Sequence, residues 1–236
     1  MADALGFAEL HGGGSRVVLL PALGGRIRDL TIAGRQWLWH NPEIPFAVPP
    51  ADATSYVLAA DSGGWDECAP TIAPCTLDAA VLVDHGDLWS QRAAVAIETL
   101  PDGQRATCEW TGRAYPFLAR RTVTVTPSGA VRFAYALTNT GSERRPFQWA
   151  THPLFPLTPD TRIELPEGAA IRIDAHHGMP HAAVAGGAAA ELLTVYRGAE
   201  VPEVDGAAFG QTLAATYSRA SVEVCNRDLS IESIAS

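Results

Sequence analysis

The sequence contains no lysine, and all 17 basic residues among its 236 positions are arginines. Reactions that need a lysine amine, such as Schiff-base formation and the anchoring of pyridoxal phosphate, are therefore excluded. A phosphate-binding P-loop is excluded for the same reason. The formal net charge is −9, and the longest basic runs are the pairs Arg120-Arg121 and Arg144-Arg145. A chain with this charge distribution is not expected to bind nucleic acid or an anionic membrane surface.

Cysteines and long apolar runs are also few. No apolar run approaches ~18 residues, the length that spans a membrane, and no basic segment precedes an apolar one near the start. The cysteines have no C-x-x-C spacing, which favours free thiols in a reducing compartment and predicts no bound metal. We therefore expect a cytoplasmic protein without a membrane partner. The cysteines are Cys68, Cys75, Cys108 and Cys225.

Short runs of strand-favouring residues, separated by glycine, proline, asparagine or aspartate, dominate the chain. The clearest is segment 121–141, in which two alternating runs flank Pro127-Ser128-Gly129 and predict a hairpin. No segment keeps a helical apolar period over three turns, and there is no internal repeat or domain boundary. We predict an all-β protein, a single large antiparallel β-sandwich domain over residues 1–236. Further predicted strands lie within 15–21, 24–34, 35–40, 91–100, 145–155, 161–168, 169–178 and 220–228.

Two histidines stand where a strand begins or ends. His85 lies in the segment DHGDLW (84–89), between two aspartates that can orient an imidazole. His152 ends an apolar strand before Pro153, which stops ladder pairing and presents the ring at a sheet edge. Histidine suits proton transfer because its ordinary pKa of about 6.5 is close to neutral pH. The alternative interpretation is structural, with both rings hydrogen-bonded in a turn or a sheet corner.

A third polar segment lies in a proline-rich stretch, residues 42–74, that has few strand signals. Long irregular excursions in compact domains are usually functional. Trp65 offers an apolar face, and Asp66 and Glu67 offer hydroxyl acceptors, a combination that suits a sugar. A tryptophan simply buried under a loop is the alternative.

Four further segments follow one another along the chain: LPALGGRIRDLTIAGRQWLW (20–39), GGWDECAPTI (63–72), DHGDLW (84–89) and YALTNTGSERRPFQWATHPLF (135–155). In this order they resemble the aldose 1-epimerase (galactose mutarotase) superfamily. The form GGWDExxPT is similar to a divergent branch of that superfamily, and the resemblance covers roughly residues 16–156.

The resemblance implies a large antiparallel β-sandwich and an enzyme that interconverts the α and β anomers of a small carbohydrate. In that family one group takes the proton of the anomeric hydroxyl and another protonates the ring oxygen, without metal or organic cofactor. The resemblance implies that His152 is the acid for the ring oxygen and His85 the second, substrate-binding histidine of the site. Asp87 and Trp89 are then further sugar contacts. We expect both histidines and Trp65 to meet in one cleft.

The chain departs from the family pattern in two places. Pro70-Thr71-Ile72 stands where better-known members have Asn-Arg-Ile, so their substrate-binding arginine is missing. The family base is a glutamate near the C-terminus, and Glu223 and Glu232 stand in no recognisable motif. A non-catalytic carbohydrate-binding protein and a sandwich module of a polysaccharide lyase or glycoside hydrolase are the competing interpretations. The family also has more terminal strands, which predicts an exposed edge and a homodimer or covering contact near residues 212–225.

Overall fold

A computed structural model describes residues 5–77 and 79–156. The chain has two compact units, and the description below concerns the one that contains the described residues up to 155. The prediction of a single domain over 1–236 stays a prediction, because it extends over residues outside the described part. The predicted strands after residue 156 and the contact surface at 212–225 also lie outside it.

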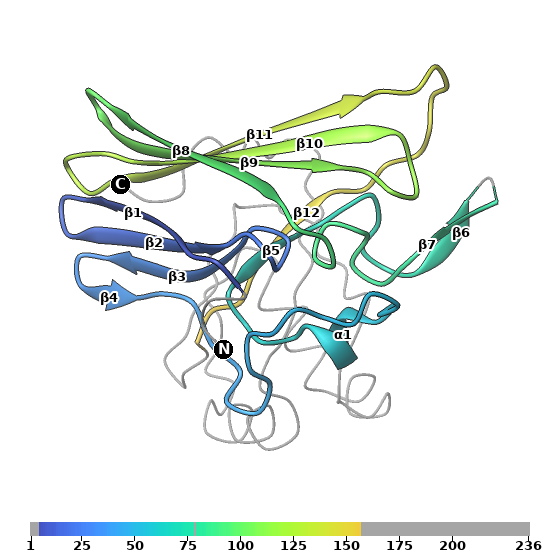
Figure 1. Cartoon of the computed structure of the whole chain (residues 1–236), viewed down its shortest axis with the longest axis horizontal. Helices are drawn as coiled ribbons and strands as arrows, with labels where there is room; N and C mark the ends of the chain where they lie inside the picture. The colour runs from blue at the N-terminus through green and yellow to red at the C-terminus, as the bar shows by residue number, and fades with distance from the viewer. Residues whose placement is uncertain (1–4, 78, 157–236) are drawn as a thin grey trace, which may run out of the picture. The chain divides into compact units, whose positions relative to one another are not determined.

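Two large antiparallel sheets and one small one form the unit (Figure 1). One has the strand order β1-β2-β3-β5-β12, with β4 beside β3, and the other has the order β11-β10-β9-β8. A third, small sheet pairs β6 with β7. The strands of the first sheet are β1 (Ala8–Gly12), β2 (Ser15–Leu20), β3 (Arg26–Ile32), β4 (Arg35–Gln36), β5 (Trp65–Cys68) and β12 (Ala150–Pro153). The remaining strands are β6 (Cys75–Leu77), β7 (Ala80–Leu82), β8 (Ala94–Leu100), β9 (Gly103–Thr111), β10 (Phe117–Val125) and β11 (Val131–Asn139).

The two larger sheets pack face to face, with β1 against β9 and β10 (Figure 1). Their facing side chains form one apolar core, because side chains alternate along each strand and one set of each sheet points inward. The predicted all-β antiparallel sandwich is confirmed. Core residues of the first sheet include Leu10, Val17, Leu19 and Ile27, and those of the second include Trp110, Phe117, Val123 and Val125.

The hairpin predicted for 121–141 is confirmed. Strands β10 and β11 pair in register from Phe117 opposite Asn139 to Val125 opposite Val131. The turn is closed by the N–H of Thr126 on the carbonyl of Ala130, at 2.9 Å. The irregular stretch predicted for 42–74 needs correction, because it contains the buried strand β5 and the four-residue helix α1 (Tyr56–Ala59). Within the described residues, no helix is long and apolar enough to cross a membrane.

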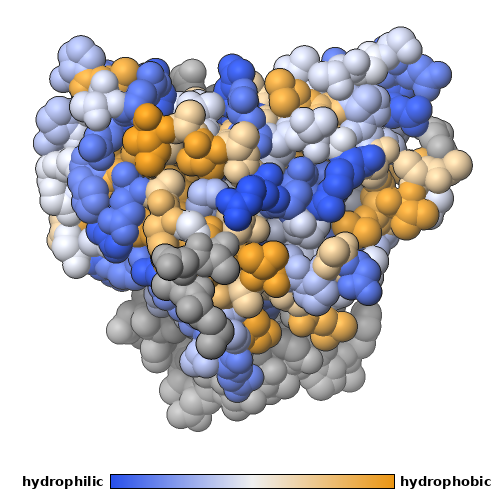
Figure 2. Space-filling view, viewed as in Figure 1, coloured by the Kyte–Doolittle hydropathy of each residue, from blue (hydrophilic) through white to orange (hydrophobic). Residues whose placement is uncertain are grey.

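Apolar residues also reach the surface. Figure 2 shows them interspersed with polar ones on the face in view. Scattered apolar side chains of this kind are normal for a folded domain. The large exposed ones include Val48, Leu58, Val81, Ile97, Leu137 and Phe155.

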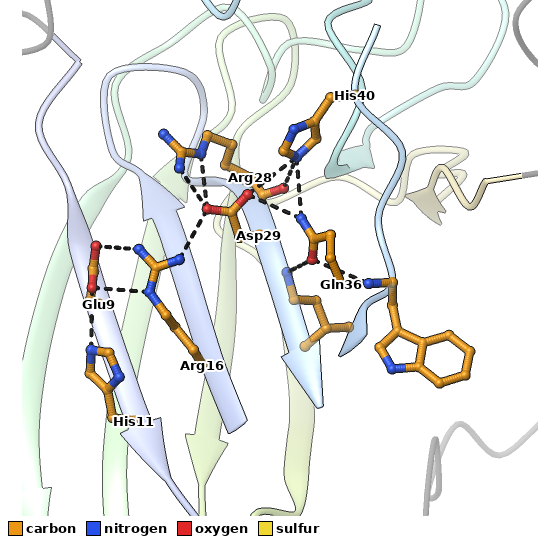
Figure 3. A network of polar contacts seen from close by, with 9 residues as sticks. Glu9, His11, Arg16, Arg28, Asp29, Gln36 and His40 are labelled. Carbon is orange, nitrogen blue, oxygen red and sulfur yellow. Dashed lines mark hydrogen bonds and ion pairs between the residues drawn. The ribbon is translucent and has the colours of Figure 1, made fainter. Parts of the chain in front are cut away.

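A polar network joins strands β1 to β4, with Asp29 at its centre (Figure 3). Its carboxylate accepts hydrogen bonds from Arg28 at 2.7 Å and Arg16 at 3.3 Å. It also accepts one from Gln36 at 3.1 Å and lies 3.2 Å from the His40 ring. Burial alone would raise the pKa of Asp29, but His40 and Arg28 outweigh it and hold that pKa well below its usual range. The network therefore stabilises the fold when Asp29 is ionised.

Asp29→Asn should lower the free energy of unfolding at pH 7 by about 1.5–3 kcal/mol, the usual worth of hydrogen bonds to a charged group. Since the folded-state pKa is depressed, this contribution is present above the ordinary pKa of about 3.9 and disappears as the pH falls through the lower folded value. Wild type and variant should therefore converge in acid. Urea titrations across that range measure both effects.

Glu98→Gln is the matched control, because it removes the exposed pair that Glu98 makes with Arg105. An exposed pair should contribute less than about 1 kcal/mol. Equal losses in the two variants would contradict the central role of Asp29.

Candidate functional site

Strand β5 presents different chemistry on its two faces. Asp66 pairs with His152 of β12 in the ladder, and Cys68 pairs with Ala150. Residues directly opposite each other in an antiparallel ladder share a face, and alternate residues of one strand do too. Asp66, Cys68 and His152 therefore lie on one face of the sheet, and Trp65 and Glu67 lie on the other.

The Asp66 carboxylate holds His152 and Arg26 at once. Nδ1 of His152 lies 3.1 Å from Oδ1, and the Arg26 guanidinium donates to Oδ2 at 2.9 Å. Arg26 is completely buried and also donates to the carbonyl of Ala60 at 2.6 Å and to the Ser62 hydroxyl at 2.8 Å. Burial would raise the pKa of Asp66, but Arg26 and then His152 hold it well below its usual range. An ionised Asp66 therefore fixes one nitrogen of the His152 ring.

His85 stands in a tight turn with left-handed backbone geometry, at φ +61°. Such a conformation is uncommon for a residue other than glycine and is found where the surroundings enforce it, often at functional sites. The N–H of His85 donates to the carbonyl of Ile72 at 2.8 Å, and Gly86 follows with φ +73°. Nδ1 of His85 lies 2.7 Å from a carboxylate oxygen of Asp84. The expectation that a flanking aspartate orients this imidazole is confirmed for Asp84.

The two imidazoles lie side by side. Their ring centroids are 4.9 Å apart, with an angle of 67° between the planes. Tyr56, the first residue of α1, stacks on His85 with 4.3 Å between centroids and meets His152 edge-on at 5.5 Å. Its backbone N–H donates to Asp84 at 3.0 Å, which connects the helix to the histidine turn. The His85 and His152 side chains keep exposed fractions of 13% and 16%, so neither ring is completely buried.

Cys68 completes a group of potential ligands. The metal-binding atoms of Cys68, His85 and His152 all lie within 4.8 Å of one another. The thiol is buried, and this burial, followed by the charges of Asp66 and Glu67, raises its pKa. The cysteine spacing in the sequence shows nothing of this group, because its three members come from β5, a turn and β12.

Trp65 and Glu67 are not brought to the histidines. Trp65 stacks on Phe133 with 4.4 Å between centroids, and Glu67 accepts hydrogen bonds from Arg121 and Tyr135, each at 3.0 Å. Burial raises the pKa of Glu67 to about 7 against the attraction of Arg121. The expectation that Trp65 shares a cleft with the histidines is therefore wrong, since its ring lies between the two sheets.

Asp87 and Trp89 support the histidine turn and are not presented to a ligand. Asp87 accepts the backbone N–H groups of Arg113 at 2.7 Å and Ala114 at 3.0 Å. Trp89 is 1% exposed, and its indole N–H donates to the carbonyl of Asp84 at 2.9 Å. Of the predicted sugar contacts, only Asp66 lies beside the histidines in the described part of the chain, and its carboxylate already holds other side chains.

Comparison with known proteins supports the fold alone. No family model matches the sequence, and no curated protein matches it. Among solved structures, the chain is similar to the Slr1438 protein from Synechocystis sp. PCC 6803, with a TM-score of 0.51 and 19% sequence identity. The similarity covers 70% of this chain and 58% of that protein, so this chain spans less than two thirds of that neighbour's length.

Gly86→Ala should destabilise the protein more than Gly34→Ala. Both glycines have positive φ, +73° and +79°, so either substitution costs about 1–2 kcal/mol for the left-handed backbone. Of the two, only at position 86 would the new Cβ clash with backbone, at the carbonyl group of Ala69, whereas nothing lies within 4 Å at position 34. Urea unfolding measures the difference. Equal losses in the free energy of unfolding would mean that the turn around His85 and Gly86 adjusts to the added methyl group at little cost.

Proposed function

We propose that this protein is an aldose 1-epimerase-like isomerase, which interconverts the α and β anomers of a sugar by acid–base ring opening and closure. The observation that carries the proposal is the pair of imidazoles, His85 and His152, with centroids 4.9 Å apart and each paired with its own aspartate. The order of sequence motifs points to the same reaction.

The chemistry needs two proton-transfer groups close together. The hydroxyl and the ring oxygen of a cyclic aldose are bonded to the same carbon, so a base for one and an acid for the other must be neighbours. When the ring opens, the base becomes protonated and the acid deprotonated, and closure on the other face reverses the roles. Histidine performs both roles near neutral pH.

The aspartates determine which ring nitrogen reacts. Asp84 and Asp66 each lie against Nδ1 of their histidine, which leaves Nε2 as the nitrogen for the sugar. The resemblance assigns His152 to the ring oxygen. We assign His85 to the anomeric hydroxyl, as a hydrogen-bond partner and as base. The family glutamate has no counterpart among the described carboxylates, and Glu223 and Glu232 lie outside the described residues.

A non-catalytic carbohydrate-binding protein is the competing proposal. Binding proteins of that kind stack a sugar on an exposed aromatic face, and the two tryptophans predicted to contact the sugar, Trp65 and Trp89, are each 1% exposed and offer none. A binding protein would have to use other aromatic residues that are exposed, such as Trp37 and Phe155. The described cysteines Cys68, Cys75 and Cys108 are free thiols, in keeping with the cytoplasmic location that we propose.

His152→Ala should slow mutarotation of the preferred aldose by roughly 10²–10⁴-fold, the usual contribution of a positioned acid–base group. Sugar affinity should change much less, because a proton transferred only in the transition state affects turnover and not ground-state binding. His85→Ala should reduce both turnover and affinity. Polarimetry on freshly dissolved aldoses, corrected for the uncatalysed rate, and sugar titrations of each variant measure these effects.

The matched control is His11→Ala, which removes a more exposed histidine on β1. Its turnover should equal that of the wild type. A wild-type protein that binds sugars yet adds nothing to the uncatalysed rate across a panel of aldoses would refute the isomerase and leave the binding protein.

A further inference from the structure

We propose that Cys68, His85 and His152 form a binding site for a thiophilic divalent cation such as Zn²⁺. We further propose that the bound ion blocks proton transfer by the two imidazoles. The first statement is independent of the proposed function, and the second rests on it.

The donor set is the one that such a cation prefers. Zinc binds one thiolate and two imidazoles with Zn–S of about 2.3 Å and Zn–N of about 2.0–2.1 Å, and a site with three protein ligands keeps a fourth position open. These bond lengths put tetrahedral ligand atoms roughly 3.3–3.7 Å apart. The three ligand atoms lie within 4.8 Å of one another, so side-chain movements that shorten these distances by roughly 1–1.5 Å would close them around an ion.

The surroundings of the ligands provide an independent reason. A histidine that binds a metal almost always has its other ring nitrogen on a carboxylate, a carbonyl or water, which fixes the tautomer and the ring orientation. Asp84 does this for His85 at 2.7 Å, and Asp66 does it for His152 at 3.1 Å. Both rings are therefore oriented before any ion arrives. A purely structural role, in a turn for His85 and at a sheet corner for His152, would not require a carboxylate partner on both rings.

Local charge also favours a cation. The carboxylates of Asp66 and Asp84 contact the two ligand rings, and the guanidinium of Arg26 is paired with Asp66. When the ion binds, the sulfur of Cys68 forms the bond to the metal, and its proton passes to the solvent. The ion compensates the charge of the thiolate, and the carboxylates on the two rings add to the negative potential that attracts it.

Metal binding and sugar isomerisation need the same atoms. With Nδ1 of each histidine on an aspartate, Nε2 is the nitrogen that either an ion or a sugar oxygen must use. A bound ion occupies the lone pairs of both rings, so neither ring can accept a proton. Zinc should therefore inhibit mutarotation, and a chelator should restore it.

Titration of the whole protein with Co²⁺ in a chelator-free buffer tests the site without any sugar. The wild type should bind one ion per chain and develop both a thiolate-to-cobalt charge-transfer band and the intense visible bands of tetrahedral cobalt. Cys68→Ser should lose the charge-transfer band. Cys75→Ser is the matched control, because Cys75 is exposed on β6 and outside the ligand group; this variant should keep the band.

A second variant keeps the test valid if Cys68→Ser fails to fold. Asp84→Asn keeps all three ligands but weakens the orientation of His85, so its affinity for Co²⁺ should fall by about 10–100-fold, the usual effect of losing such a partner. The charge-transfer band should persist at saturation. Absence of the band in the wild type, or its persistence in folded Cys68→Ser, would overturn the proposal.

Polarimetry with added Zn²⁺ then separates the two proposals. Each protein is compared with its own zinc-free rate, and the wild type should lose most of its activity and recover it with chelator. Cobalt binding without any mutarotase activity would refute the proposed function and leave the metal site. Mutarotase activity that is insensitive to zinc, in a chain that gives no cobalt spectrum, would refute the metal site and leave the function.

Discussion

The structure around the site depends on the ion pair between Arg26 and Asp66. Arg26 is completely buried, and a buried guanidinium without a carboxylate would cost several kcal/mol, roughly 3–5. Its pairing with Asp66 at 2.9 Å joins β3 to β5, and its bonds to Ala60 and Ser62 fix the chain that leads into β5. The second oxygen of Asp66 holds His152. One carboxylate thus connects the interior of the sheet to a candidate catalytic ring.

The other half of the site is held by local geometry. His85 has a left-handed backbone, which costs about 1–3 kcal/mol and persists only where the surroundings enforce it. Asp84 provides this constraint by bonding the His85 ring with one oxygen and the backbone of Tyr56 with the other. Tyr56 then stacks on His85. The strained turn, the short helix and the ladder of β5 with β12 together place two imidazoles at 4.9 Å.

The sandwich could be predicted from sequence, and so could the location of His85 in a turn, because the signals for both are local. Alternation in 121–141 specifies a hairpin, and the glycine after His85 marks a turn. Strand β5 was missed because Asp66 and Glu67 interrupt the apolar pattern, and each finds a buried arginine far away in sequence. No sequence pattern around Tyr56 or Arg26 predicts that these residues support the histidine site. Trp65 was misplaced because composition alone does not reveal which face of a strand a side chain takes.

The central claim is that both aspartates hold Nδ1 and leave Nε2 for chemistry. Long-range proton–nitrogen NMR of the imidazole side chains measures this directly, with His85→Gln and His152→Gln spectra to assign the signals. At a pH where the rings are neutral and without added metal, both histidines should be protonated on Nδ1, with an unprotonated Nε2. In ring opening, His152 gives the Nε2 proton of its cationic form, and the neutral ring takes a proton back at Nε2 when the sugar closes. A neutral ring protonated on Nε2 in place of Nδ1 would contradict the account, because its unprotonated Nδ1 would then face the aspartate and its Nε2 could not bind a cation.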